Sequence, residues 1–103
     1  MNPIEPIIPI HIRQMRLEDL PAVIALDQRS FALPWPESSF RFEIESNELS
    51  RCWVAETESP DGATILVAMV VIWLIVDEAH VATIAVHPDY RRQKIAQPLL
   101  ALN

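Results

Sequence analysis

The chain has 103 residues, half of them apolar, and a formal net charge of −6. This length allows one domain with a hydrophobic core, and the apolar content excludes an intrinsically disordered chain. The acidic balance argues against a nucleic-acid-binding protein, and because Cys52 is the single cysteine, no disulfide can form within the chain. A lone cysteine is typical of a reducing compartment, so we expect a cytoplasmic protein.

The first nine residues are expected to form an extended N-terminal extension, residues 1–9, ahead of a single domain over residues 10–103. Three prolines recur in this stretch at every third position, and proline removes the backbone donor that a helix needs. The stretch also lacks the basic start of a secretion signal. Residues 10–16 then alternate apolar and polar side chains, which predicts an edge strand or a half-buried strand.

Two helices are predicted next, separated by a proline-rich loop. Asp19 is a candidate N-cap, and a proline two residues later lies in the first turn, where its missing N–H costs nothing, so we expect a helix over Leu20–Ser30. The segment Phe31–Pro36, which contains two prolines, ends this helix. A second short helix is predicted over Glu37–Ser46, with Phe40 on its buried face.

The second half of the domain predicts three antiparallel strands, over residues 51–57, 65–76 and 80–87. Ser59–Gly62, with the single glycine of the chain, forms the first turn, and Asp77–Glu78 forms the second. The apolar run 63–76 is shorter than the ~20 residues of a membrane-spanning helix, and its Val and Ile content favours a central strand, so no membrane association is expected. The order β-α-α-β-β-β-α predicts an α+β fold, with a mostly antiparallel sheet flanked by helices.

The stretch His80–Leu100 runs from a strand through a basic turn into the start of a helix. The strand is β-branched and apolar, which predicts burial on both faces. Pro88 and Asp89 end it, and the turn that follows carries three cations, Arg91, Arg92 and Lys94. Cationic side chains beside the free N–H groups of a helix start predict a phosphate-binding turn, and a solvated basic turn is the alternative. Because proline disfavours helical geometry in the residue before it, Pro98 predicts a helix that begins late or is distorted.

The sequence IAVHPDYRRQKIA, residues 84–96, resembles the acetyl-coenzyme A signature of the GNAT superfamily of N-acetyltransferases. In that family an apolar strand is followed by a V-x-P-x-Y/x-R turn and by the motif Q/R-x-x-G-x-G/A, which opens a helix. Arg91 and Ala96 stand at the first and last positions of that motif, and Lys94 replaces its first glycine. A glycine lets the backbone approach a phosphate closely, whereas lysine adds a charge and a Cβ atom. The order of elements also matches the N-terminal part of the GNAT fold.

This resemblance implies a partial GNAT fold with acetyl-coenzyme A (acetyl-CoA) as the cosubstrate. In the family the strand splays from its neighbour at a bulge, and the pantetheine arm pairs there with backbone N–H groups. The corresponding residues of this chain are Ile84, Ala85 and Val86. The pyrophosphate lies against the turn that follows, where the implied contacts come from Arg91, Arg92, Gln93, Lys94, Ile95, Ala96 and Gln97.

The segment FALPWPESSF, residues 31–40, is similar to the F-x-x-P-W-x-x-x-x-F segment of the ribosomal-protein alanine N-acetyltransferases. Those enzymes acetylate the α-amino group of a protein N-terminus. The implied acceptor is therefore a protein or peptide N-terminus, with a ribosomal protein among the candidates. In the family the loop between the first two helices borders the acceptor groove, which makes Trp35 and Phe40 candidate substrate-binding residues. The alternative is ordinary packing of the loop onto the helix.

The main candidate for a catalytic base within the chain is a histidine. In the branch that the chain resembles, the catalytic glutamate and tyrosine follow the coenzyme A helix, beyond Asn103. Other GNAT members place a base on the strand of the coenzyme motif, which points to His80, because histidine titrates near neutrality. The alternative is a strand-end histidine without a catalytic role, and Glu78 in the turn is a weaker candidate. No histidine has metal-ligand spacing with the cysteine, so no metal is expected.

Two functional interpretations stay open. One is an acetyl-CoA-dependent N-acetyltransferase of the ribosomal-protein alanine type, represented by its N-terminal part. The other is a truncated, catalytically inactive module that binds coenzyme A weakly or only self-associates. A GNAT domain normally continues beyond this point, so the strand over residues 80–87 is expected to leave an unpaired edge through which a homo-oligomer could form. The chain is accordingly a fragment, a natural truncation, or a protein completed by partner subunits.

Overall fold

The computed structural model describes residues 8–93 and 95–100. Its strands are β1 His11–Gln14, β2 Ser50–Glu58, β3 Thr64–Ile75 and β4 Glu78–Val86, and its helices are α1 Leu20–Ser30, α2 Glu37–Glu45 and α3 Ala96–Leu100. Two short 3₁₀ turns, η1 Leu17–Asp19 and η2 Pro88–Tyr90, precede α1 and follow β4. The order confirms the predicted α+β fold. Three parts of the chain lie outside the described residues: residues 1–7 of the predicted N-terminal extension, Lys94, and residues 101–103.

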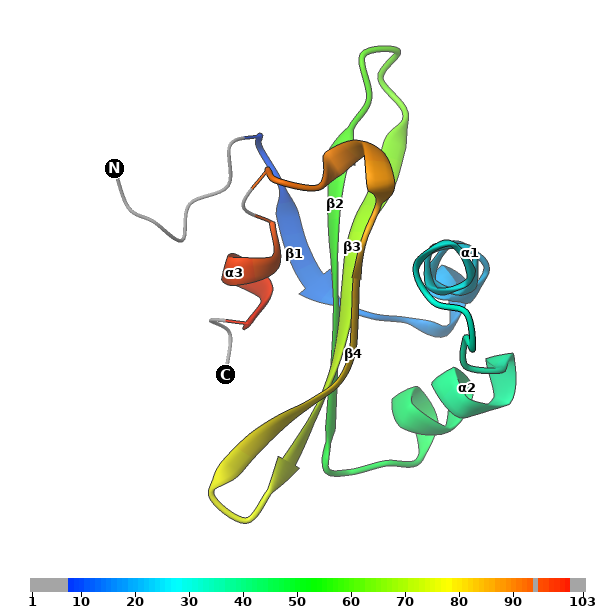
Figure 1. The fold of residues 1–103 in the computed structure, drawn as a ribbon, viewed down its shortest axis with the longest axis vertical. Coiled ribbons are helices and arrows are strands. Elements are labelled where there is room, and N and C mark those ends of the chain that lie inside the picture. The colour runs from blue at the N-terminus through cyan, green and yellow to red at the C-terminus, as the bar shows by residue number, and fades with distance from the viewer. Residues whose placement is uncertain (1–7, 94, 101–103) are drawn as a thin grey trace.

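The described strands form one antiparallel sheet in the order β1-β2-β3-β4. Figure 1 shows α1 and α2 on one face of this sheet and α3 on the other. In the turn between β2 and β3, Gly62 has a φ of +88°, a conformation that glycine adopts without strain. The turn between β3 and β4 places Val76 at a φ of 56°, in the left-handed region that residues with a Cβ atom rarely adopt.

Strand β3 carries the hydrophobic core on both of its faces. Met69 and Val71 pack in the cluster that includes the α1 and α2 side chains, whereas Val70 and Ile72 pack with Ile95 and the α3 side chains. Six consecutive β3 residues, 67–72, are at most 1% exposed. The long apolar run is therefore a central strand, as predicted. Within the described residues, no helix is long and apolar enough to cross a membrane.

Asp19 occupies the predicted N-cap position of α1, but its side chain does not cap the helix. Its two carboxylate oxygens accept hydrogen bonds from the Arg13 guanidinium, each at 2.8 Å, and one of them also accepts the Arg16 backbone N–H at 2.7 Å. The Arg13 guanidinium lowers the pKa of Asp19. The carboxylate thus joins β1 to the start of α1, because a bidentate arginine is a stronger partner than a helix N–H.

Strand β4 is buried only along its second half, so the prediction of burial on both faces is wrong for its first half. His80 and Val81 are about half exposed, whereas Thr83 and Ala85 are buried. The cause is visible in Figure 1, where the β3–β4 hairpin extends past the helices that cover the sheet. A bulge separates the two halves, because Val71 pairs with Thr83 and Ile72 with Val81, which leaves Ala82 without a partner.

Candidate functional site

The outer edge of β4 presents backbone groups that no described strand pairs. The His87 N–H donates to the Val67 carbonyl at 2.7 Å, so His87 faces β3. Because backbone orientation alternates along a strand, Ala85 also faces β3, and the backbone groups of Ile84 and Val86 face the open edge. The Val86 carbonyl accepts a hydrogen bond from Arg91 Nε at 3.1 Å, which agrees with this orientation. Two of the three N–H groups predicted to contact pantetheine therefore point outward.

The turn after β4 brings most of the predicted pyrophosphate-binding residues into one pocket. This pocket, which we call the arginine-lined pocket, has a volume of about 290 Å³ and is lined by Val86, Tyr90, Arg91, Arg92, Ile95, Ala96 and Gln97. Gln93 lies on the same turn without lining the pocket, and Lys94 lies outside the described residues. Helix α3 starts at Ala96, two residues before Pro98, so Gln97 is helical and the predicted effect of Pro98 on that residue is wrong. A proline in the first turn of a helix loses no helical hydrogen bond, which explains why it is tolerated there. Two exposed guanidinium groups beside a short apolar wall suit a phosphate ester, because arginine binds phosphate oxygens bidentately.

Two arginines near this pocket have features that the sequence alone did not indicate. Arg92 has a φ of 66°, in the left-handed region where glycine is favoured. Arg29, on α1, places its guanidinium 3.1 Å from His87 Nε2 and so adds a cation at the end of β4. The two residues are 58 positions apart in the chain, and no local pattern reports a contact over that distance.

A second pocket lies between α1, the loop after it and the bulge of β4. It has a volume of about 350 Å³, and its lining residues are Asp27, Phe31, Ala32, Leu33, Trp35, Ala82 and Thr83. Trp35 also packs against Phe40, with ring centroids 5.2 Å apart, and stacks on Trp73 at 6.5 Å. Phe40 is fully buried and does not line this pocket, which agrees with the alternative of ordinary packing. Of the two predicted substrate-binding residues, Trp35 lines this pocket and Phe40 packs behind it.

Asp27 is the buried carboxylate of this second pocket, which we call the Asp27 pocket. Its Oδ2 atom accepts the Trp35 backbone N–H at 2.7 Å, and its Oδ1 atom has no hydrogen-bond partner among the described residues. Burial raises the pKa of Asp27. Asp27 was not among the predicted site residues, although it lies four positions after Val23 on the apolar stripe of α1, where a charged residue is unexpected.

His80, the predicted base, lies at the exposed start of β4. Its Nε2 atom is 3.0 Å from Glu78 Oε2, and the side chain lines neither the Asp27 pocket nor the arginine-lined pocket. The geometry therefore adds no support to a catalytic role for His80, which stays a prediction. Within residues 8–93 and 95–100, no group of three or more His, Cys, Asp or Glu side chains could hold a metal ion.

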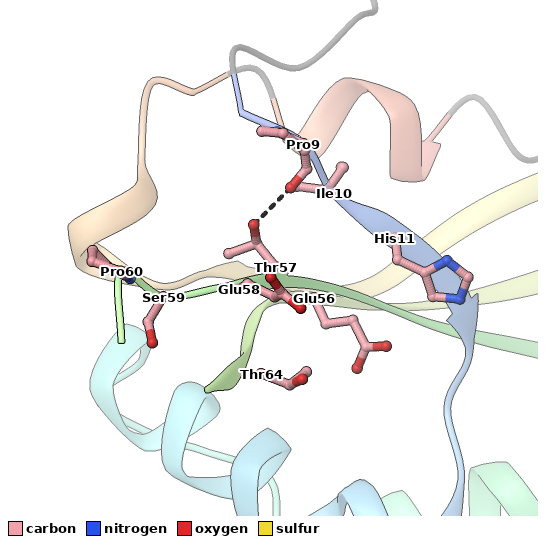
Figure 2. A pocket seen from close by; sticks show the side chains of 9 residues that line it. All are labelled: Pro9, Ile10, His11, Glu56, Thr57, Glu58, Ser59, Pro60 and Thr64. Atoms are coloured by element: carbon pink, nitrogen blue, oxygen red, sulfur yellow. Dashed lines mark hydrogen bonds between the residues drawn. The ribbon is translucent and has the colours of Figure 1, made fainter. Parts of the chain in front are cut away.

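A third pocket lies at the opposite end of the sheet order, along β1 and β2 (Figure 2). It has a volume of about 680 Å³ and contains none of the predicted site residues. Two of its polar groups are engaged within the protein: Glu56 pairs with Arg13 at 3.2 Å, and the Thr57 hydroxyl donates to the Pro9 carbonyl at 2.6 Å, as Figure 2 shows for the second contact. This pocket is therefore left out of the candidate site.

Comparisons with known proteins identify one family. Residues 20–102 match the model of the Acetyltransferase (GNAT) family. The ribosomal protein bS18-alanine N-acetyltransferase of Escherichia coli (strain K12) is 34% identical over 89 residues, which are 86% of this chain and 55% of that protein. A Bacillus subtilis (strain 168) relative, provisionally named for the same activity, is 35% identical over 88 residues, which are 85% of this chain and 55% of that protein.

Solved structures show the same fold. The crystal structure of the ribosomal-protein-S18-alanine N-acetyltransferase from Escherichia coli matches with a TM-score of 0.73 and 30% identity, over 91% of this chain and 56% of that one. An aminoglycoside 6'-N-acetyltransferase from Acinetobacter baumannii matches with a TM-score of 0.72 at 18% identity, over 91% of this chain and 68% of that one, which shows a shared fold alone. The chain spans about half the length of the curated relatives it matches.

Proposed function

The chain belongs to the GNAT acetyltransferase family, and we propose that it forms the cosubstrate-binding and acceptor-binding part of an N-acetyltransferase that acts on protein N-termini. GNAT acetyltransferases use acetyl-CoA as the acetyl donor. The proposed acceptor is the α-amino group of a protein or peptide N-terminus, with a ribosomal protein as the candidate. Identities of 34–35% to relatives named for that activity support this choice. The proposed domain covers residues 10–103.

The observation that carries the proposal is the arginine-lined pocket directly after the open edge of β4. Arg91 and Arg92 supply the charge that a pyrophosphate requires, and Ile95 and Ala96 supply an apolar wall beside them. The outward N–H groups of Ile84 and Val86 are free to bind an extended, amide-containing arm as a further strand would. A cosubstrate held this way would extend along β4 toward the bulge at Ala82, which borders the Asp27 pocket.

The acceptor side of the proposal rests on the position of Trp35. This residue lines the Asp27 pocket while its ring is fixed by Phe40 and Trp73, so the wall it forms is rigid. Phe40 then acts by holding Trp35 in place. Both pockets border the second half of β4, one at Val86 and the other at Ala82 and Thr83. A donor that extends along this strand from the first pocket would approach an amine held in the second, which acyl transfer requires.

Calorimetric titration with acetyl-CoA tests this proposal. We expect micromolar binding by the unmodified chain, weakened at least about tenfold in an Arg91→Ala/Arg92→Ala variant, because each guanidinium contributes charge-assisted hydrogen bonds. The matched control is Arg41→Ala/Arg51→Ala, which removes the same charge from exposed positions on α2 and β2 that line no part of the arginine-lined pocket. Equal losses in both variants, or no binding by a folded chain, would contradict the proposal.

The open edge of β4 favours the second interpretation, a module that self-associates without catalysis. The edge is unpaired by any described strand, and the exposed Val81 lies on the same strand. Sedimentation analysis across protein concentration, with and without acetyl-CoA, separates the two. A dimer that dissociates when acetyl-CoA binds would place the cosubstrate at this edge, and a dimer indifferent to acetyl-CoA together with no detectable binding would favour the non-enzymatic module.

A further inference from the structure

Asp27 combines full burial with an unused acceptor. The residue has no exposed surface, one carboxylate oxygen is bound by the Trp35 N–H, and the other has no partner among the described residues. A buried carboxylate oxygen without a donor is costly, because it has lost its hydration and gained no hydrogen bond in return. Such a group lowers the stability of the protein unless another donor reaches it, which points to a ligand that supplies the missing donor.

The surroundings of Asp27 define the chemistry of that ligand. The other described residues that line its pocket are Phe31, Ala32, Leu33, Trp35, Ala82 and Thr83, none of which carries a charge. An anion would be repelled by the carboxylate, and a neutral apolar group would leave the oxygen unsatisfied. A primary ammonium group attached to a small apolar side chain satisfies both the carboxylate and the apolar walls.

We infer that Asp27 binds the α-ammonium group of the acceptor N-terminus through Oδ1, while the Trp35 N–H holds Oδ2 and so fixes the carboxylate plane. This inference rests on the proposed function and assigns it a specific acceptor-binding residue. Thr83 and Ala82 lie in the same pocket, on the strand whose next residues face the open edge. The amine is therefore held beside the part of β4 along which the donor is proposed to lie.

The test compares two peptides that begin with alanine and contain no lysine, identical except that one has a free α-amine and the other is N-acetylated. Binding to the unmodified chain is measured by calorimetry, with and without coenzyme A. We expect the free-amine peptide to bind at least about tenfold more tightly than the acetylated one, since only the former offers an ammonium to a buried carboxylate.

The first variant is Asp27→Asn, whose side-chain oxygen can still accept the Trp35 N–H while the negative charge is removed. We expect it to lose the preference for the free amine. The matched control, Asp77→Asn, makes the same change in the exposed turn between β3 and β4 and should keep the preference. A retained preference in Asp27→Asn would overturn the inference, as would equal binding of both peptides to the unmodified chain.

A second variant keeps the inference testable if Asp27→Asn fails to fold. Leu33 lines the Asp27 pocket and is 91% exposed, so a substitution there leaves the core unchanged. Leu33→Lys adds a competing ammonium at the rim and should weaken binding of the free-amine peptide at least about tenfold, whereas the neutral control Leu33→Gln should not. Equal binding by these two variants would overturn the inference.

The titration with acetyl-CoA is run on the same samples, so the two proposals fail separately. If acetyl-CoA binds but the free-amine peptide is not preferred, or if that preference does not depend on Asp27, the inference is overturned and the proposed function stands. If acetyl-CoA does not bind and the Asp27-dependent preference is present, the amine site is supported and the proposed function is overturned.

Discussion

Replacing Val76 by glycine should stabilise the protein, although it removes a branched apolar side chain. Ile75 pairs with Glu78, so Val76 and Asp77 form a two-residue hairpin turn, and Val76 has a φ of 56°. A left-handed conformation costs an L-residue about 1–2 kcal/mol, and two-residue turns with a positive φ at the first central position favour glycine there. The valine side chain is 93% exposed, so its loss forfeits almost no burial.

The expected gain for Val76→Gly is about 1 kcal/mol, because the relieved strain exceeds the roughly 0.5–1 kcal/mol that glycine costs through the entropy of the unfolded chain. Urea unfolding, followed by circular dichroism, measures this change, and a gain of that size corresponds to a rise in melting temperature of roughly 4–8 °C. Val76→Ala is the control, since it removes the branch but keeps the Cβ atom and should leave stability within about 0.5 kcal/mol. Equal stability of the two variants would show that the backbone is not strained at this position.

Three further predictions concern charged residues. Because burial raises the pKa of Asp27 above 3.8, the native protein binds this proton more tightly than the unfolded chain does. The free energy of unfolding therefore falls as pH rises from the pKa of the unfolded chain through the higher pKa of the native protein. Asp27→Asn should therefore be more stable than the unmodified chain near about pH 7 and similar near about pH 3 in urea unfolding. The opposite sign holds for Asp19, because Arg13 lowers its pKa. Asp19→Asn should lower the free energy of unfolding by about 2 kcal/mol at neutral pH and by less in acid. A loss of stability that does not depend on pH would contradict the ion pair. Arg92→Gly should raise stability by roughly 1 kcal/mol in the same assay while it weakens acetyl-CoA binding in calorimetry, and unchanged affinity would exclude Arg92 from the pyrophosphate site.

The elements of the fold were predictable because their signals are local. Helix α1 has the bounds predicted from its proline, its apolar spacing and the proline-rich segment that ends it. Strands β2 and β3 start and end within one residue of the predicted positions, because turn residues with identifiable chemistry separate them. The GNAT motif likewise identified in advance most of the residues that line the arginine-lined pocket.

The features that were not predicted depend on contacts between distant segments. The half-buried state of β4 depends on how far α1 reaches along the sheet, which no pattern within β4 records. Phe40 and Trp35 belong to one motif, yet packing places one in the core and the other on a pocket wall. The unpaired oxygen of Asp27 is visible only when its partners are known in three dimensions.

The two helical layers described above share a single strand, and this has a thermodynamic consequence. Alternate residues of β3 support opposite layers: Met69 and Val71 hold the side of α1, and Val70 and Ile72 hold the side of α3. Removal of either layer would expose the apolar face of β3 that this layer covers. The other layer packs on the opposite face of the same strand, so it depends on the same strand geometry. The half of the molecule that carries the Asp27 pocket and the half that carries the arginine-lined pocket therefore form one cooperative folding unit, and a substitution in either core destabilises both pockets together.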